Sequence, residues 1–184
     1  MQFASLMNQS LQPTAQWIEI ASTFQLPGFV IIGLPSPEIG EARERVRAAV
    51  EASGREFPKR RIVVNLSPAA IKKRGTGVDL AIALAVIGAE DVGALPDRKV
   101  LAWGELGLDG RVKPAGQIFR AVAAAWISGC ERLIVAREEQ HAATEAITFL
   151  SAEAPRWGAA PHVVSVSHMR EAWDAAMGEP SAPC

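Results

Sequence analysis

Short runs of β-branched residues alternate along this 184-residue chain with segments of helical periodicity. The clearest helix is predicted over 36–54, where apolar residues recur on one face at Ile39, Ala42, Val46, Ala49 and Val50. Ser36 and Pro37 open this segment and Gly54 follows it, as is typical of helix termini. Because strands and helices that alternate pack in layers, the order predicts a single α/β (α+β) domain with a mixed sheet.

Strands are predicted at 17–21, 29–32, 61–66, 100–103, 105–108, 132–135 and 162–165. The first two flank a turn at 25–28 and are expected to pair as an N-terminal hairpin. Asp109 and Gly110 signal a second hairpin turn. Further helices are predicted at 80–88, capped by Asp79, and at 117–128, 139–150 and 167–177. We expect residues 1–16 to be a poorly ordered lead-in, 17–177 to be the domain and 178–184 a disordered tail.

Composition excludes several classes of protein. Apolar residues make up 49% of the chain and charged residues 21%, which is normal for a packed globule. No apolar run reaches the roughly 20 residues of a membrane helix, and no signal peptide is evident. Cys130 and Cys184 are too few for a disulfide framework. We expect a cytoplasmic protein with no membrane contact.

Charge is distributed unevenly. Ten lysines and arginines but only three glutamates lie between Arg43 and Arg74, a net charge of +7 that leaves −8 for the remainder. Such a segment can attract phosphate, or it can be a solvated helix face followed by a basic loop, and both interpretations stay open. The candidate phosphate-binding residues are Lys59, Arg60 and Arg61, together with Lys72, Lys73, Arg74 and Gly75 just before a helix start.

Catalytic motifs are missing. The sequence contains no G-x-x-x-x-G-K-[ST], no G-x-G-x-x-G and no G-x-S-x-G, and its three histidines do not form a metal-ligand set. We therefore predict that the isolated chain is not an enzyme and holds no cofactor or metal.

A series of motifs nevertheless resembles one family over about residues 17–147. Their order and spacing are similar to the N-terminal domain of magnesium-chelatase-like AAA+ ATPases of the ComM/YifB type: Gly33–Pro35, Glu41–Ala49, Phe57–Pro58, Ile62–Ala69, Lys72–Gly75, Asp79–Leu84, Gly104–Gly110 and Val112–Pro114. The resemblance implies the fold named after the second domain of a small-subunit ribosomal protein, as in the Lon proteolytic domain and the RadA C-terminal domain. It also implies a hexameric ATPase that acts on DNA in recombination.

In that family an ATPase module should follow the N-terminal domain, whereas this sequence ends at Cys184. ATP and Mg²⁺ are therefore expected on an AAA+ module supplied in cis or in trans, and a hexamer only together with it. Magnesium insertion into a porphyrin is poorly supported, because the part shared with the true chelatase subunits is that module.

Lon-type peptidases use a Ser–Lys pair in which a lysine activates the serine nucleophile. When the Lon loop is matched to Gly75–Asp79, the serine position becomes Gly77, and the lysine position becomes Phe119. Thr76 is adjacent but has no evident base. The favoured function is thus a non-catalytic accessory domain that contributes subunit contacts and weak, non-specific contacts to DNA. The alternatives are a standalone interaction module or a degenerate Lon-like Ser–Lys peptidase.

Overall fold

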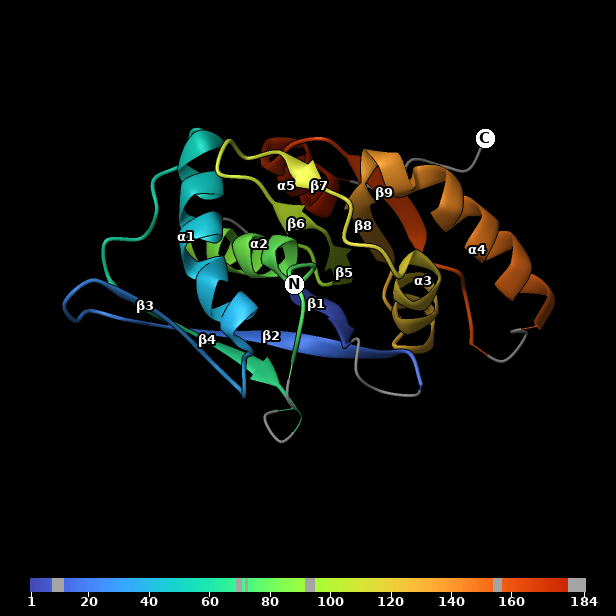
Figure 1. Cartoon of the computed structure of the whole chain (residues 1–184), viewed down its shortest axis with the longest axis horizontal. Coiled ribbons are helices and arrows are strands. Elements are labelled where there is room, and N and C mark those ends of the chain that lie inside the picture. Colours follow the sequence, from blue (N-terminus) through green and yellow to red (C-terminus); the bar gives the residue numbers. More distant parts are fainter. Residues whose placement is uncertain (8–11, 69–70, 72, 92–94, 154–156, 179–184) are drawn as a thin grey trace.

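The structure is a computed structural model that describes residues 1–7, 12–68, 71, 73–91, 95–153 and 157–178. Within these residues seven strands form one sheet in the order β3-β4-β2-β1-β5-β8-β9, and β6 and β7 form a small hairpin (Figure 1). The strands are β1 (Gln2–Met7), β2 (Thr14–Thr23), β3 (Gly28–Ile32), β4 (Arg61–Ser67), β5 (Lys99–Trp103), β6 (Glu105–Leu106), β7 (Val112–Lys113), β8 (Arg132–Ala136) and β9 (His162–Val166). The helices are α1 (Pro37–Ala52), α2 (Asp79–Glu90), α3 (Ile118–Ile127), α4 (Gln140–Glu153) and α5 (Met169–Met177), with a 3₁₀ turn at Arg137–Glu139.

The sheet is mixed but mostly parallel. Strand β1 pairs with β2 in antiparallel register and with β5 in parallel register, and the pairs β5–β8, β8–β9 and β3–β4 are parallel. This arrangement confirms the predicted mixed α/β class. The second hairpin is also confirmed, since β6 and β7 are antiparallel around Asp109 and Gly110.

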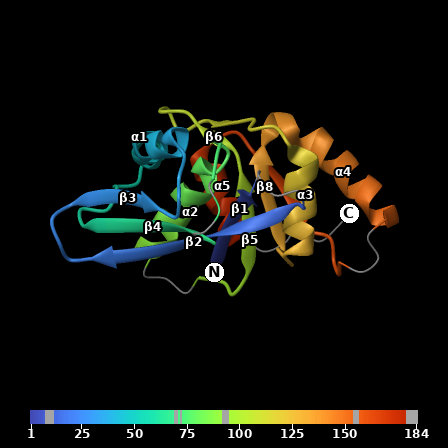
Figure 2. The same ribbon diagram turned by 60° about the horizontal axis from the view of Figure 1, so that its bottom comes forward.

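Two sequence-based expectations about the N-terminal region are wrong. Residues 2–7 are not a frayed lead-in, because they form the strand β1 between β2 and β5. The strands β2 and β3 do not pair with each other, because β4 lies between them (Figure 2). The expected tail, 178–184, lies outside the described residues except for Gly178.

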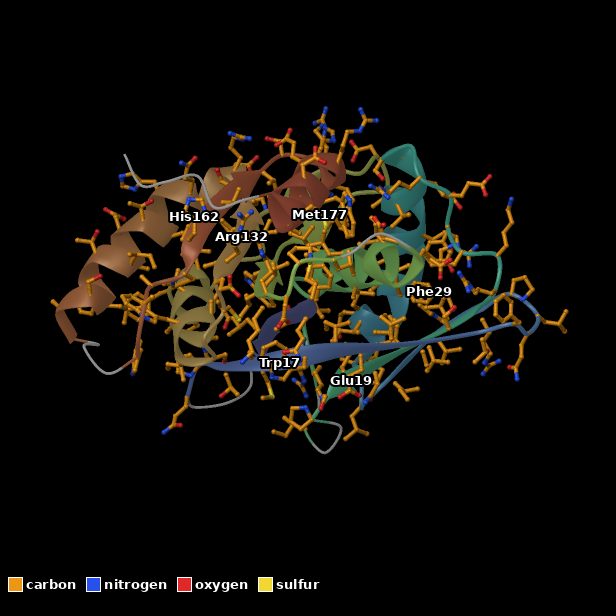
Figure 3. The ribbon with its side chains drawn as sticks, turned by 180° about the vertical axis from the view of Figure 1, so that it is seen from behind. Trp17, Glu19, Phe29, Arg132, His162 and Met177 are labelled. Atoms are coloured by element: carbon orange, nitrogen blue, oxygen red, sulfur yellow. The ribbon has the colours of Figure 1, made fainter. Side chains whose placement is uncertain are left out.

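Helices cover the two faces of the sheet unequally. One apolar core joins α1, α2 and α5 to the face that includes Ile18, Ile62 and Val100, and a second core joins α3 and α4 to the face that includes Leu6 and Leu133. The second core reaches only the start of β2, at Ala15 and Trp17, and does not cover the rest of β2 or the strands β3 and β4, where Glu19 and Ile32 are exposed. Figure 3 shows Trp17 and Glu19 along β2, where the covered part of this face gives way to the open part.

The described part of the chain contains no helix that is both long enough and apolar enough to cross a membrane.

Candidate functional site

The loop before α2 contains the position that the Lon comparison assigns to a serine. A Cβ atom added to Gly77 would lie 2.5 Å from Cζ2 of the Trp103 indole. That indole is buried, and its Nε1 donates a hydrogen bond to the carbonyl oxygen of Gly116 at 2.6 Å. The Trp103 ring therefore occupies the space that a serine side chain at position 77 would need, which gives glycine here a packing role.

The position assigned to the lysine is equally unsuited to proton transfer. Phe119 lies on α3, 44% exposed, and its ring contacts that of Phe149 edge to face, with centroids 5.7 Å apart. Neither Gly77 nor Phe119 thus presents a hydroxyl or an amine.

Asp79, the first residue of α2, forms the most deeply buried ion pair described. Arg45 on α1 donates from Nε to Oδ2 at 2.6 Å and from Nη2 to Oδ1 at 3.1 Å, while the Leu106 backbone N–H lies 3.4 Å from Oδ2. Burial raises the pKa of Asp79 to about 6, although the hydrogen bond from Arg45 lowers it in part. The prediction that Asp79 caps the helix is wrong: its carboxylate joins α2 to α1, and the N-cap residue is Val78, which makes no side-chain cap hydrogen bond.

Thr76 has a carboxylate partner that sequence reasoning missed. Its hydroxyl donates to Oε2 of Glu105 at 2.5 Å, and Lys113 lies 3.8 Å from the other oxygen of Glu105. These contacts connect the loop before α2 to the β6–β7 hairpin.

Lys73, a predicted phosphate ligand, is buried, with 2% of its surface exposed. Its Nζ donates to the carbonyl oxygens of Gly33, at 2.9 Å, and Pro68. Burial lowers the pKa of Lys73. The Lys73 ammonium therefore holds two loops together and is not presented to a ligand at the surface, which corrects its predicted role. Arg74 is exposed and Gly75 half-buried, whereas Lys72 lies outside the described residues.

The other basic cluster lies at the opposite end of β4. Lys59 and Arg61 are exposed, and Lys59 pairs with Glu56 at 3.1 Å. Arg60 is engaged internally, because its Nη2 lies 2.5 Å from Glu90. Seven residues of β4 extend roughly 20 Å, at about 3.3 Å per residue, between this cluster and the loop that contains Lys73. The two clusters therefore do not form one patch of six charges.

Exposed basic side chains instead gather around the α1–β4 connection. The guanidinium of Arg47 lies 4.6 Å from the centroid of the Phe57 ring, which is buried against Phe29. Lys59 follows Phe57 by two residues and Arg61 by four. These three exposed residues, Arg47, Lys59 and Arg61, are here called the β4 basic cluster.

Comparison with known proteins gives a match over residues 18–139 to the family described as subunit ChlI of Mg-chelatase. The chain belongs to this family. It is 34% identical to the uncharacterized protein YifB of Escherichia coli over 126 residues, which are 67% of this chain and 24% of that protein. It is 33% identical to the competence protein ComM of Haemophilus influenzae over 141 residues, 76% of this chain and 28% of that protein. An uncharacterized protein of Mycobacterium tuberculosis is 40% identical over 119 residues, 64% of this chain and 24% of that protein.

The expectation that this chain is not an enzyme is wrong. ChlI-like proteins are AAA+ ATPases, which are enzymes, and this chain aligns with them over most of its length. The expectation relied on motifs missing from 184 residues, but the chain spans only about a quarter of the length of the curated relatives it matches. The resemblance to the ComM/YifB type is confirmed.

Proposed function

We propose that these residues form the part of a Mg-chelatase-like AAA+ ATPase that contacts neighbouring subunits and the backbone of DNA. The support is the match to the ChlI family together with the β4 basic cluster, in which Arg47, Lys59 and Arg61 are exposed. We also propose that the fold is that of the Lon proteolytic and RadA C-terminal domains, with the Lon serine and lysine positions replaced by Gly77 and Phe119.

ATP and Mg²⁺ belong, in this proposal, to an AAA+ module of the same assembly, in cis or in trans. Among the residues described here, the N-terminus of α2, the helix that follows the basic loop, does not suit the phosphates of a nucleotide. A helix N-terminus attracts phosphate through free N–H groups, but at α2 the buried carboxylate of Asp79 lies at that end and would repel one.

The expected contact with DNA is electrostatic and independent of sequence. If two phosphates are engaged per domain, log K falls against log salt with a slope of about −1.4 for single strands and about −1.8 for duplex. The affinity of a lone domain is then of the order of non-specific binding, and several domains on one DNA molecule would multiply it.

The test is DNA binding over a range of salt concentrations, with the wild-type chain and a Lys59→Ala/Arg61→Ala variant. The variant should lose most of the salt dependence without a change in melting temperature, because both side chains are exposed. Arg111→Ala is the matched control, since Arg111 is an exposed arginine on the β6–β7 hairpin that is not part of this cluster. An unchanged slope in the double variant, or no binding by the wild type at low salt, would refute the contact and favour an interaction module without a role in DNA binding.

A further inference from the structure

Two apolar surfaces lie at opposite ends of the long axis of the molecule. The first is the loop between β2 and β3, whose Phe24 and Leu26 are 95% and 88% exposed. In Figures 1 and 2 this loop is at the left end of the molecule, and α4 is at the right end. Neighbouring apolar side chains that are exposed together form the kind of patch that marks interaction sites.

The loop is ordered by its surroundings and does not rely on burial of its own apolar side chains. The guanidinium of Arg60 lies 5.3 Å from the centroid of the Phe24 ring, and the Arg60 side chain is itself held by Glu90. The Gly28 N–H donates to the carbonyl of Arg60. A loop already held in place loses less conformational entropy when it binds.

The second surface is a groove of about 660 Å³ beside α3. Phe119 and Ile127 on its rim are 44% and 47% exposed, and the exposed ring of Phe149 on α4 packs against Phe119. The walls are mostly apolar and include Pro13, Phe119, Ala123, Ile127, Leu150 and Trp157.

The charges beside the two surfaces are complementary. The loop is flanked by the exposed cations Lys59 and Arg61 at the start of β4. On α4, Glu145 lies one turn before Phe149 with 70% of its side chain exposed and lies 3.4 Å from His141, and the segment Gln140–Glu153 contains no lysine or arginine. A second copy of this chain therefore offers the loop an apolar groove and, on the helix beside it, the exposed carboxylate of Glu145.

We propose that the β2–β3 loop of one copy binds in the α3–α4 groove of the next copy, head to tail. This inference rests on the proposed role in subunit contacts and specifies which surfaces make them. Because the two surfaces differ, the interface is heterologous, and its repetition generates a ring where the rotation closes. Each copy then contributes one loop and one groove.

The experiment is sedimentation velocity on the 184-residue chain without DNA, so that its result is separable from the DNA-binding test. The wild type should self-associate as concentration rises. A loop variant, Phe24→Ser/Leu26→Ser, and a groove variant, Ile127→Lys, should each remain monomeric. Mixing the two variants should restore a one-to-one dimer, because the groove of the first and the loop of the second are both intact.

The matched control is Leu108→Ser, which removes an exposed apolar side chain, 65% exposed, from the turn between β6 and β7. This variant should self-associate like the wild type. All the substituted side chains are at least partly exposed, and unchanged melting temperatures would show that the variants are folded. A wild-type chain that stays monomeric at all concentrations, variants that still self-associate, or a mixture that stays monomeric would each overturn the proposal.

Discussion

Arg45 on α1 donates two hydrogen bonds to the buried carboxylate of Asp79 on α2, at 2.6 and 3.1 Å. The two residues are 34 positions apart, and their contact joins two helices that cover the same face of the sheet. Only 18% of the Arg45 side chain and none of the Asp79 side chain is exposed, so water screens the pair weakly.

Replacement of Arg45 by methionine should strongly destabilise the fold. The substitution leaves the Asp79 carboxylate buried without a counter-charge, for which a loss of about 3–5 kcal/mol in the free energy of unfolding is typical. Urea denaturation at neutral pH measures this loss. Glu41→Gln is the control, because Glu41 is 77% exposed and lies 3.8 Å from the same guanidinium, and a change below about 0.5 kcal/mol is expected. Equal effects of the two substitutions would show that the buried pair contributes nothing.

The raised pKa of Asp79 predicts a pH dependence of stability. Its folded-state pKa of about 6 lies above the ordinary 3.8, so the folded protein binds the proton more tightly than the unfolded chain does. The stability that this proton contributes is complete below about pH 4 and is lost as pH rises through about 6. At 1.36 kcal/mol per unit, the loss amounts to at most about 3 kcal/mol.

The measurement is the free energy of unfolding from pH 4 to pH 7 for the wild type and for Asp79→Asn, which cannot titrate. The wild type should lose stability relative to the asparagine variant across this range. Parallel curves would mean that Asp79 has the same pKa in the folded and unfolded states.

Local signals explain which elements could be predicted from the sequence. The helix α1 has its periodicity and its terminal residues in one continuous segment, and the Asp109–Gly110 turn carries its own signature, so both were predicted correctly. The strand β1 has no such signal, because residues 3–7 are all buried and show no alternation of apolar and polar residues.

The errors at the candidate site come from contacts between distant segments. Insertion of β4 between β2 and β3 depends on pairing between residues 33 positions apart for β3 and 38 to 50 positions apart for β2, which sequence adjacency does not indicate. The sequence of the loop, with two lysines and an arginine, does not distinguish cations that face water from a cation that binds two backbone carbonyls. The burial of Lys73 could therefore not be predicted. Likewise, nothing in the sequence near Asp79 indicates that Arg45 is its partner.

Gly77 should not tolerate the serine that a Lon-type site would need. Because the added Cβ would lie 2.5 Å from the Trp103 ring, Gly77→Ser should destabilise the protein, with overpacking typically costing about 1–3 kcal/mol. Gly40→Ala is the matched control: Gly40 lies within α1 with nothing within 4 Å of its added Cβ, and a gain of roughly 0.5–1 kcal/mol is expected. Thermal denaturation of both variants tests the packing role, which a fully stable Gly77→Ser protein would contradict.

Lys73 should be required for stability and not for contact with DNA. Lys73→Met keeps the length of the side chain but leaves the carbonyl oxygens of Gly33 and Pro68 without their donor, and a loss of about 1–3 kcal/mol is expected. The salt dependence of DNA binding should be unchanged, because the ammonium does not face solvent. Arg61→Ala should show the reverse pattern, with a weaker salt dependence and an unchanged melting temperature. Measuring the melting temperature and the salt dependence of DNA binding for both variants separates a structural cation from a phosphate-binding one. If Lys73→Met instead lost salt dependence without being destabilised, the basic loop would be the part that contacts DNA.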